Sequence, residues 1–136
     1  MTNASLAGSY LIKARTRLKI LTVLLDEGAY SDTIREAQEA VELACKGMLR
    51  HAGIEPPHWH DVGELLREYR ARLTPASDEE IEKAAAASAW LRKEREFSFY
   101  GDIDFIPTER YSREDAVRAI DDARFVVALA GRTLAR

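Results

Sequence analysis

The sequence predicts an all-α protein, an antiparallel bundle of four or five helices that forms a single domain over residues 1–136. Three observations support this fold class. Apolar residues recur at three- and four-residue spacing along most of the chain, which is the period of one helix face. At three places a Ser or Asp stands three positions before an acidic residue, as at many helix starts. The alternation typical of a β-strand is confined to one short candidate stretch, Ile103–Phe105.

The first two predicted helices are long and antiparallel. The first begins after Ser5 and ends near Gly28, and the second covers Tyr30–Gly53, before two prolines. Their apolar stripes are Leu11, Ala14, Leu18, Leu21 and Leu25 in the first, and Ile34, Ala37, Val41, Cys45, Met48 and Ala52 in the second.

A third, shorter helix is predicted to open at His60-Asp61, where Asp61 and Glu64 have the spacing of a capping box. We expect it to continue through Leu73 and to end at Thr74-Pro75. Its apolar stripe is Val62, Leu65, Leu66, Tyr69 and Leu73.

Two further capping boxes, Ser77 with Glu80 and Ser112 with Asp115, begin the last two predicted helices. The fourth helix runs toward Phe99 and ends near Gly101, and the last helix continues through Leu134. The segment Gly101–Tyr111 between them contains a proline and is predicted to be a loop.

Composition and charge limit the possible classes of protein. Hydrophobic residues make up 46% of the chain and charged residues 32%, which is too apolar for a disordered chain. The formal net charge is −3, so any contact with nucleic acid must be local. No apolar run approaches the ~20 residues that cross a bilayer, and no signal peptide is visible. The single cysteine, Cys45, cannot form an internal disulfide, and we expect a cytoplasmic protein with no membrane partner.

The end of the fourth helix is the main candidate site. Arg92, Arg95 and Phe99 share one helix face, so two guanidiniums and an aromatic ring can project together. This combination suits a phosphate with a stacked base. The alternative is a solvated helix end whose arginines pair with nearby acids, namely Glu94, Glu96 or Asp102.

Two other polar clusters have simpler explanations. His51, His58 and His60 with Asp61 are metal-ligand types, but their spacing matches no usual zinc motif, and we expect no metal and no cofactor. The second helix carries a polar face in which Glu42 and Lys46 form a favourable pair four residues apart. That face consists of Arg35, Gln38, Glu39, Glu42 and Lys46.

The segment Ala37–Leu49 (AQEAVELACKGML), followed by His60–Leu66 (HDVGELL), resembles the HEPN domain family. The likeness extends through Arg95–Tyr111 into the last helix and covers nearly the whole chain. It implies a compact helical bundle, commonly a homodimer, often encoded beside a small nucleotidyltransferase partner in a toxin–antitoxin-like pair. Many members are metal-independent endoribonucleases.

The endoribonuclease motif of this family is an arginine, a polar residue, a short spacer and a histidine. Arg95 and Glu96 match the first two positions, whereas Tyr100, Gly101 and Asp102 stand where the histidine would fall. Histidine matters because cleavage through the 2′-hydroxyl needs a group that exchanges protons near neutral pH. The candidate catalytic residues are therefore Arg95, Tyr100 and Asp102. The candidate phosphate or nucleotide ligands are Arg92, Arg95, Glu96 and Tyr100, with Arg110 and Tyr111 added if the 101–111 loop covers the site.

Three functions follow from these residues. The leading one is a homodimer that binds RNA or a nucleotide at Arg95 and Tyr100 and works with a nucleotidyltransferase-type partner. The second is a ribonuclease that uses an unusual base, and the third is an interaction module without a ligand. The dimer also has support from aromatic residues off the core stripe or near helix ends, since such residues often mark contact surfaces. These are Trp59, Trp90, Phe97 and Phe105.

Overall fold

The structure, a computed structural model, describes residues 2–56, 58 and 61–135, without the side chain of Glu96. It confirms the predicted all-α bundle and single compact domain. The elements are α1 (Asn3–Asp26), α2 (Tyr30–His51), α3 (Val62–Glu68), the 3-10 turn η1 (Arg70–Arg72), α4 (Asp78–Phe99), α5 (Pro107–Arg110) and α6 (Arg113–Leu134).

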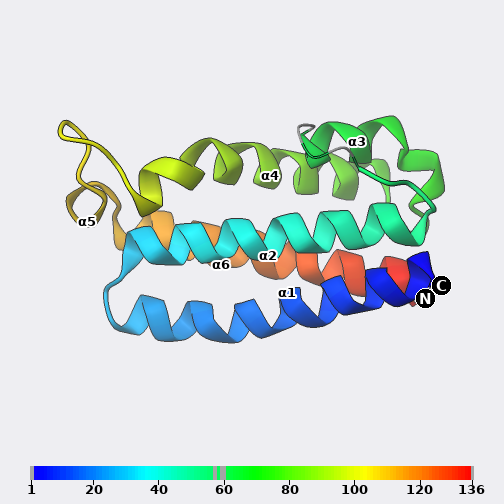
Figure 1. The fold of residues 1–136 in the computed structure, drawn as a ribbon, viewed down its shortest axis with the longest axis horizontal. Helices are drawn as coiled ribbons and strands as arrows, with labels where there is room; N and C mark the ends of the chain where they lie inside the picture. The colour runs from blue at the N-terminus through cyan, green and yellow to red at the C-terminus, as the bar shows by residue number, and fades with distance from the viewer. Residues whose placement is uncertain (1, 57, 59–60, 136) are drawn as a thin grey trace.

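Helix α2 is the centre of the bundle. It packs against α1 on one side and α4 on the other, with α6 behind it, and the two chain termini lie at the same end (Figure 1). Its apolar stripe is the most completely buried part of the core, as the spacing of its apolar residues predicts. The fully buried members are Ile34, Ala37, Ala40, Ala44, Cys45, Met48 and Leu49.

Two of the three predicted capping boxes are complete. Each pairs a serine with the acidic residue three positions later, with backbone-to-side-chain distances of 3.0 and 3.2 Å between Ser77 and Glu80 and of 2.9 and 3.1 Å between Ser112 and Asp115. At α3 the Asp61 carboxylate accepts from the Gly63 backbone N–H at 2.9 Å, whereas Glu64 pairs with Arg67 instead of completing the box.

The structure corrects the end of the third predicted helix. Helix α3 stops at Glu68, and the chain tightens into η1 before Leu73 enters the core. The tighter turn carries Arg72 to the end of α2, where its guanidinium donates to the Ala52 carbonyl. An unsatisfied helix-end carbonyl thus gains a charged donor.

The segment 101–111 is more ordered than the predicted loop. It contains the short helix α5, which starts at Pro107 as helices often do. The candidate strand at 103–105 is instead a tight turn, in which Asp102 and Phe105 exchange backbone hydrogen bonds of 3.0 and 3.1 Å. Gly101, at φ +65°, makes this turn possible, because a Cβ there would lie 2.2 Å from the Phe105 carbonyl oxygen.

None of the helices in the described ranges has the length and apolarity needed to cross a bilayer.

Candidate functional site

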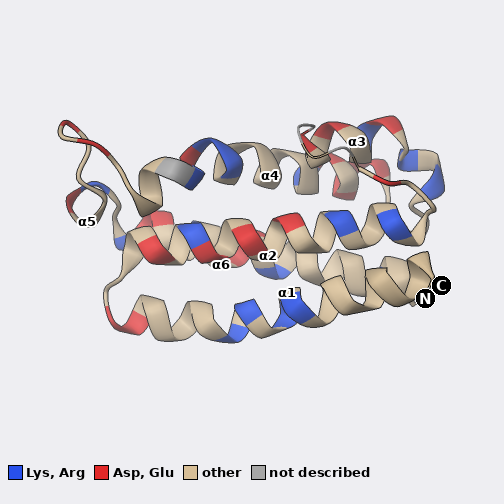
Figure 2. Cartoon of the chain, viewed as in Figure 1, with Lys and Arg blue, Asp and Glu red and all other residues tan. Residues whose placement is uncertain are grey.

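The C-terminal half of α4 and the first turns of α2 form a pocket of about 540 Å³. Four of its lining side chains are cationic and three are aromatic. Helix α2 contributes Arg35, and Tyr100 comes from the turn directly after α4. The others come from α4: Arg92, Lys93, Arg95, Phe97 and Phe99. The structure therefore places Arg92, Arg95 and Phe99, the predicted helix face, around one hollow, and Tyr100 lines it as well. Figure 2 shows basic residues on this part of α4 beside a run of acidic residues on α2.

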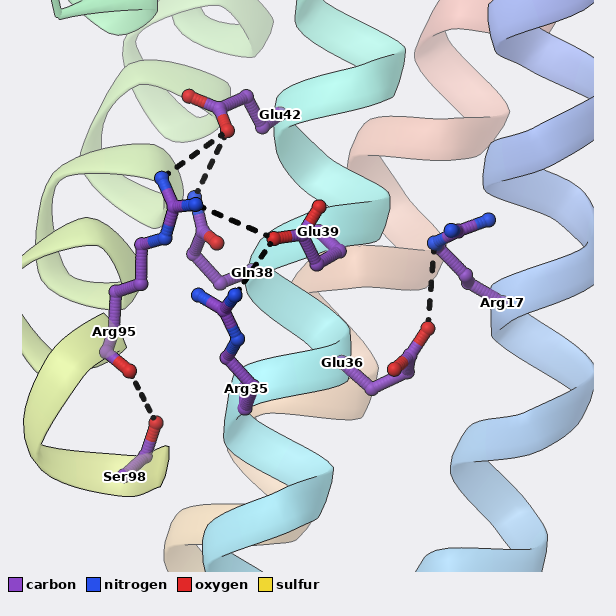
Figure 3. A network of polar contacts seen from close by, with 8 residues as sticks. All are labelled: Arg17, Arg35, Glu36, Gln38, Glu39, Glu42, Arg95 and Ser98. Atoms are coloured by element: carbon purple, nitrogen blue, oxygen red, sulfur yellow. Dashed lines mark hydrogen bonds and ion pairs between the residues drawn. The ribbon is translucent and has the colours of Figure 1, made fainter. Parts of the chain in front are cut away.

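The acidic partners of these cations come from α2. Arg95 lies 3.7 Å from both Glu39 and Glu42, and Arg35 lies 3.3 Å from Glu39 (Figure 3). The predicted alternative, pairing of Arg95 with Glu94 or Asp102 on its own segment, is not among the contacts of the described residues, and the side chain of Glu96 lies outside them. Packing of α4 along α2 supplies the nearer carboxylates, which sequence spacing within α4 cannot reveal.

The same packing changes the predicted pairing of Glu42. Instead of an ion pair with Lys46, the described contacts of Glu42 are with Arg95 and with the amide of Gln38, which donates to it at 3.4 Å. Gln38 is 3% exposed, and its Oε1 has no hydrogen-bond partner within the described ranges. A buried polar oxygen without a donor is costly, so this corner of the α2–α4 interface is polar but incompletely satisfied.

Two aromatic rings stand beside the cations. The Arg35 guanidinium lies over the Phe99 ring at 5.4 Å, and Phe99 contacts Tyr100 edge-to-face at 4.7 Å. Tyr100 is 74% exposed and Phe99 51%. Rings this exposed offer faces on which a base can stack.

The 101–111 segment lies against the opposite flank of α4. Arg110 and Tyr111 line a second, smaller hollow of about 190 Å³ together with Trp90 and Arg118. Arg110 lies over Phe105 at 5.4 Å, so the structure does not gather Arg110 and Tyr111 with Arg95. Asp102 lies in the turn, where its Oδ1 accepts from the Asp104 backbone N–H at 2.8 Å.

Tyr111 is held in place by a carboxylate. Its hydroxyl donates to Glu94 at 3.3 Å. Burial of the ring, reinforced by the negative charge of Glu94, raises the pKa of Tyr111 well above its ordinary value. This tyrosine is therefore neutral at physiological pH and acts as a hydrogen-bond donor.

The aromatic residues proposed as contact surface divide between the interior and the surface. Trp90 is half-buried between α4 and α6, where its Nε1 donates to Asp122 at 2.7 Å and Arg118 lies over its ring at 4.0 Å. Phe105 packs against Phe97, which remains 43% exposed. Trp59 lies outside the described residues.

The histidine cluster offers no metal site within the described ranges. His51 ends α2, Asp61 caps α3, and no group of three or more potential ligands is placed to hold a metal there. His60 lies outside the described residues.

The sequence places Arg35 and Glu39 on the polar face of the second helix and does not indicate that they belong to the site. The available signal was their spacing of four residues, which predicts the observed pair between them. What the spacing could not show is that Arg95 lies against the same carboxylate.

An all-α bundle with a cationic pocket between α2 and α4 defines a class of protein but does not identify an activity. A family model described as the HEPN domain matches residues 7–133, so the chain belongs to the HEPN domain family. At the family level this membership supports a nucleotide- or RNA-related helical protein.

A solved structure agrees with the fold. The chain is similar to the protein TT1696 from Thermus thermophilus, with a TM-score of 0.76 and 24% identity, over 93% of this chain and 97% of that one. At this identity the likeness concerns the fold alone. Among curated proteins no match was found.

Proposed function

We propose that the protein binds a nucleotide or RNA in the pocket that contains Arg92, Arg95 and Tyr100. The observation that carries the proposal is the convergence of four cationic side chains and three exposed aromatic rings on one hollow of a chain with net charge −3. Guanidiniums bind phosphate oxygens in pairs, and exposed aromatic rings stack on bases. The local excess of cations supplies the attraction that the whole molecule lacks.

Binding accounts for the pocket better than cleavage does. Arg95 can stabilise charge on a phosphate, and Tyr100 lies in the same pocket, but tyrosine is a poor base near neutral pH. The Asp102 carboxylate is engaged in its own turn. An endoribonuclease that uses Tyr100 or Asp102 is therefore the second candidate.

We further propose that the protein acts as a homodimer and as one half of a toxin–antitoxin-like pair with a nucleotidyltransferase-type partner, in the cytoplasm. Support comes from family membership and from the apolar side chains exposed at the end of α4 and in the turn beyond it. These are Phe97, Phe99, Tyr100, Ile103 and Ile106, of which Ile103 is 92% exposed. Light scattering should find a dimer at micromolar concentration, and a monomer would contradict this part of the proposal.

The binding proposal is tested with a fluorescent single-stranded RNA of mixed sequence, measured by anisotropy at low salt with EDTA present. Arg95→Ala and Tyr100→Ala should each weaken binding about tenfold, because a charged phosphate contact or a stacked base is lost. The matched control is Arg70→Ala, an exposed arginine that pairs with Asp78 at the opposite end of α4. It should bind as the wild type does.

Gel analysis of the same mixtures separates the candidates. Intact RNA that binds the wild type but not Arg95→Ala supports a binding protein. Cleavage by the wild type alone supports the endoribonuclease. If RNA binding is absent, or is unchanged in Arg95→Ala and Tyr100→Ala, the pocket is not the site and the interaction module remains.

A further inference from the structure

Two guanidiniums of the pocket converge on a single carboxylate oxygen. Glu39 Oε1 lies 3.3 Å from Arg35 Nη2 and 3.7 Å from Arg95 Nη2, and in Figure 3 dashed lines join this one oxygen to both arginines. Arg35 comes from α2 and Arg95 from α4. The carboxylate therefore occupies a position at which an oxygen of a bound anion would also contact both guanidiniums.

Glu39 is loosely held. Both of its ion pairs are partly exposed, with side-chain exposures of 26% for Arg35, 44% for Arg95 and 30% for Glu39 itself. At 3.7 Å the contact with Arg95 is longer than a hydrogen bond, and exposed ion pairs are weak. A stronger anion can therefore displace this carboxylate.

Glu42 is better anchored than Glu39. It is 17% exposed, and besides its contact with Arg95 it accepts a hydrogen bond from the buried amide of Gln38. Arg95 therefore keeps one partner on α2 when Glu39 moves away. The two carboxylates therefore differ in their contacts: Glu42 is held by Arg95 and by Gln38, whereas the described contacts of Glu39 are with the two arginines alone.

The charges around the pocket indicate what the ligand carries. Apart from Arg92, the cations that line it are Arg35, Lys93 and Arg95, and the carboxylates paired with them are Glu39 and Glu42. Once Glu39 moves away, Glu42 is the carboxylate still paired with Arg95, so three cations face one carboxylate, an excess of two positive charges among these four side chains. A terminal phosphate monoester carries nearly two negative charges at pH 7, because its second pKa is about 6. An internal phosphodiester of RNA carries only one.

We infer that the pocket selects a terminal phosphomonoester of a nucleotide or RNA over a phosphodiester, and that this phosphate displaces Glu39 from Arg35 and Arg95. The inference rests on the proposed binding function and adds the class of phosphate to it. Glu39 is then an internal competitor of the ligand, so its removal strengthens binding. A carboxylate that merely positions the arginines would have the opposite effect.

The experiment compares three adenosine compounds by calorimetry with the full chain. These are AMP, its 5′-O-methyl ester, which keeps the base but carries one charge, and adenosine. The wild type should bind AMP about tenfold more tightly than the methyl ester. Glu39→Gln should bind both phosphates several-fold more tightly than the wild type does.

The chain offers a matched control on the same helix. Glu36 pairs with Arg17 at 3.3 Å on the α1 side of α2 (Figure 3), so Glu36→Gln removes an equivalent charge and ion pair away from the pocket. It should leave the affinity for AMP unchanged. Thermal melts of both variants verify that they are folded.

A second arm identifies the source of the phosphate. Short RNAs of one sequence are compared with a 5′-phosphate and with a 5′-hydroxyl. A preference in both arms, or in either one, supports the inference and shows whether a free nucleotide or an RNA end is the ligand. Equal affinity for monoester and diester in both arms, or weaker binding by Glu39→Gln, overturns it.

These outcomes differ from those of the proposed function. RNA binding that depends on Arg95 without preference for a monoester rejects only this inference. Absence of binding to AMP and to either RNA rejects both.

Discussion

The two flanks of α4 differ in how their polar groups are satisfied. On the α6 flank, the Trp90 indole donates to Asp122 at 2.7 Å, Arg118 covers its ring, and Tyr111 donates to Glu94. On the α2 flank, Arg95 is held by long ion pairs of 3.7 Å and is nearly half exposed. One flank is closed by its own contacts, whereas the other keeps cations within reach of a ligand.

This difference shows why charged and aromatic residues alone do not identify a site. Both flanks combine arginines, carboxylates and rings, and both are hollowed. In the smaller hollow Arg110 and Arg118 both lie over rings of the protein itself, at 5.4 and 4.0 Å. In the larger pocket Arg35 lies over Phe99 at 5.4 Å, but Arg95 and the 74% exposed ring of Tyr100 take part in no such pair among the described residues. A ligand gains more where these interactions are still weak.

The largest expected effect is that of Trp90→Ala, because it removes a ring packed between two helices and leaves Asp122 without its donor. We expect a loss of about 3 kcal/mol in the free energy of unfolding. This value is at the lower end of the losses observed when a buried tryptophan is replaced by alanine, because Trp90 is only half-buried. Urea denaturation measures it, and Trp90→Phe, which keeps most of the ring volume, should lose less. RNA binding by the folded variant should stay close to that of the wild type. Loss of binding would mean that the two flanks do not act separately.

Gly101→Ala should have the next largest effect on stability. Alanine tolerates φ +65° poorly, and its Cβ would collide with the Phe105 carbonyl, so the turn that brings the 101–111 segment to the α6 flank must shift. We expect a loss of about 2 kcal/mol, measured by the same denaturation, together with faster amide exchange at Phe105. A fully stable Gly101→Ala variant would show that the turn adapts at little cost.

Tyr111→Phe tests the link between that segment and α4. Loss of the hydrogen bond to Glu94 should cost about 1 kcal/mol at neutral pH. Because the pKa of Tyr111 is raised in the folded state, the unfolded chain deprotonates first when the pH rises above 10.0, and the stability that this residue contributes is then lost. The wild type should therefore lose more stability above that pH than Tyr111→Phe does. If the free energy of unfolding fell equally steeply with pH in both proteins, Tyr111 would have the same pKa in the folded and unfolded states.

Much of the fold could be predicted from the sequence, because its signals are local. Apolar spacing located the four long helices, and the pairs Ser77 with Glu80 and Ser112 with Asp115 predicted where two of them begin. The early end of α3 could not be predicted in this way. The turn that follows it brings Arg72 to a carbonyl at the end of α2, twenty residues earlier in the chain, a contact that no local pattern announces.

Only part of the candidate site could be predicted, because sequence signals are local. Arg92 and Arg95 share α4 and Tyr100 directly follows its last residue, so their proximity follows from local geometry. The contribution of Arg35 and Glu39 depends on the packing of α4 along α2, a long-range contact that one sequence does not encode in any short motif. The position of Arg110 and Tyr111 in the smaller hollow, away from Arg95, likewise depends on long-range packing.

Arg95→Ala should have the smallest effect on stability, which would distinguish a role of Arg95 in binding from a role in folding. The residue takes part in two ion pairs, but its side chain is 44% exposed and both contacts are long, so we expect a change of less than about 1 kcal/mol in urea denaturation. Without the Arg95 guanidinium, Glu39 and Glu42 repel each other. Glu39 nevertheless retains its ion pair with Arg35, and Glu42 retains its hydrogen bond from Gln38. A group that matters little for folding but much for binding is free to respond to a ligand. A stability loss as large as that of Trp90→Ala would instead mean that both flanks hold the fold together.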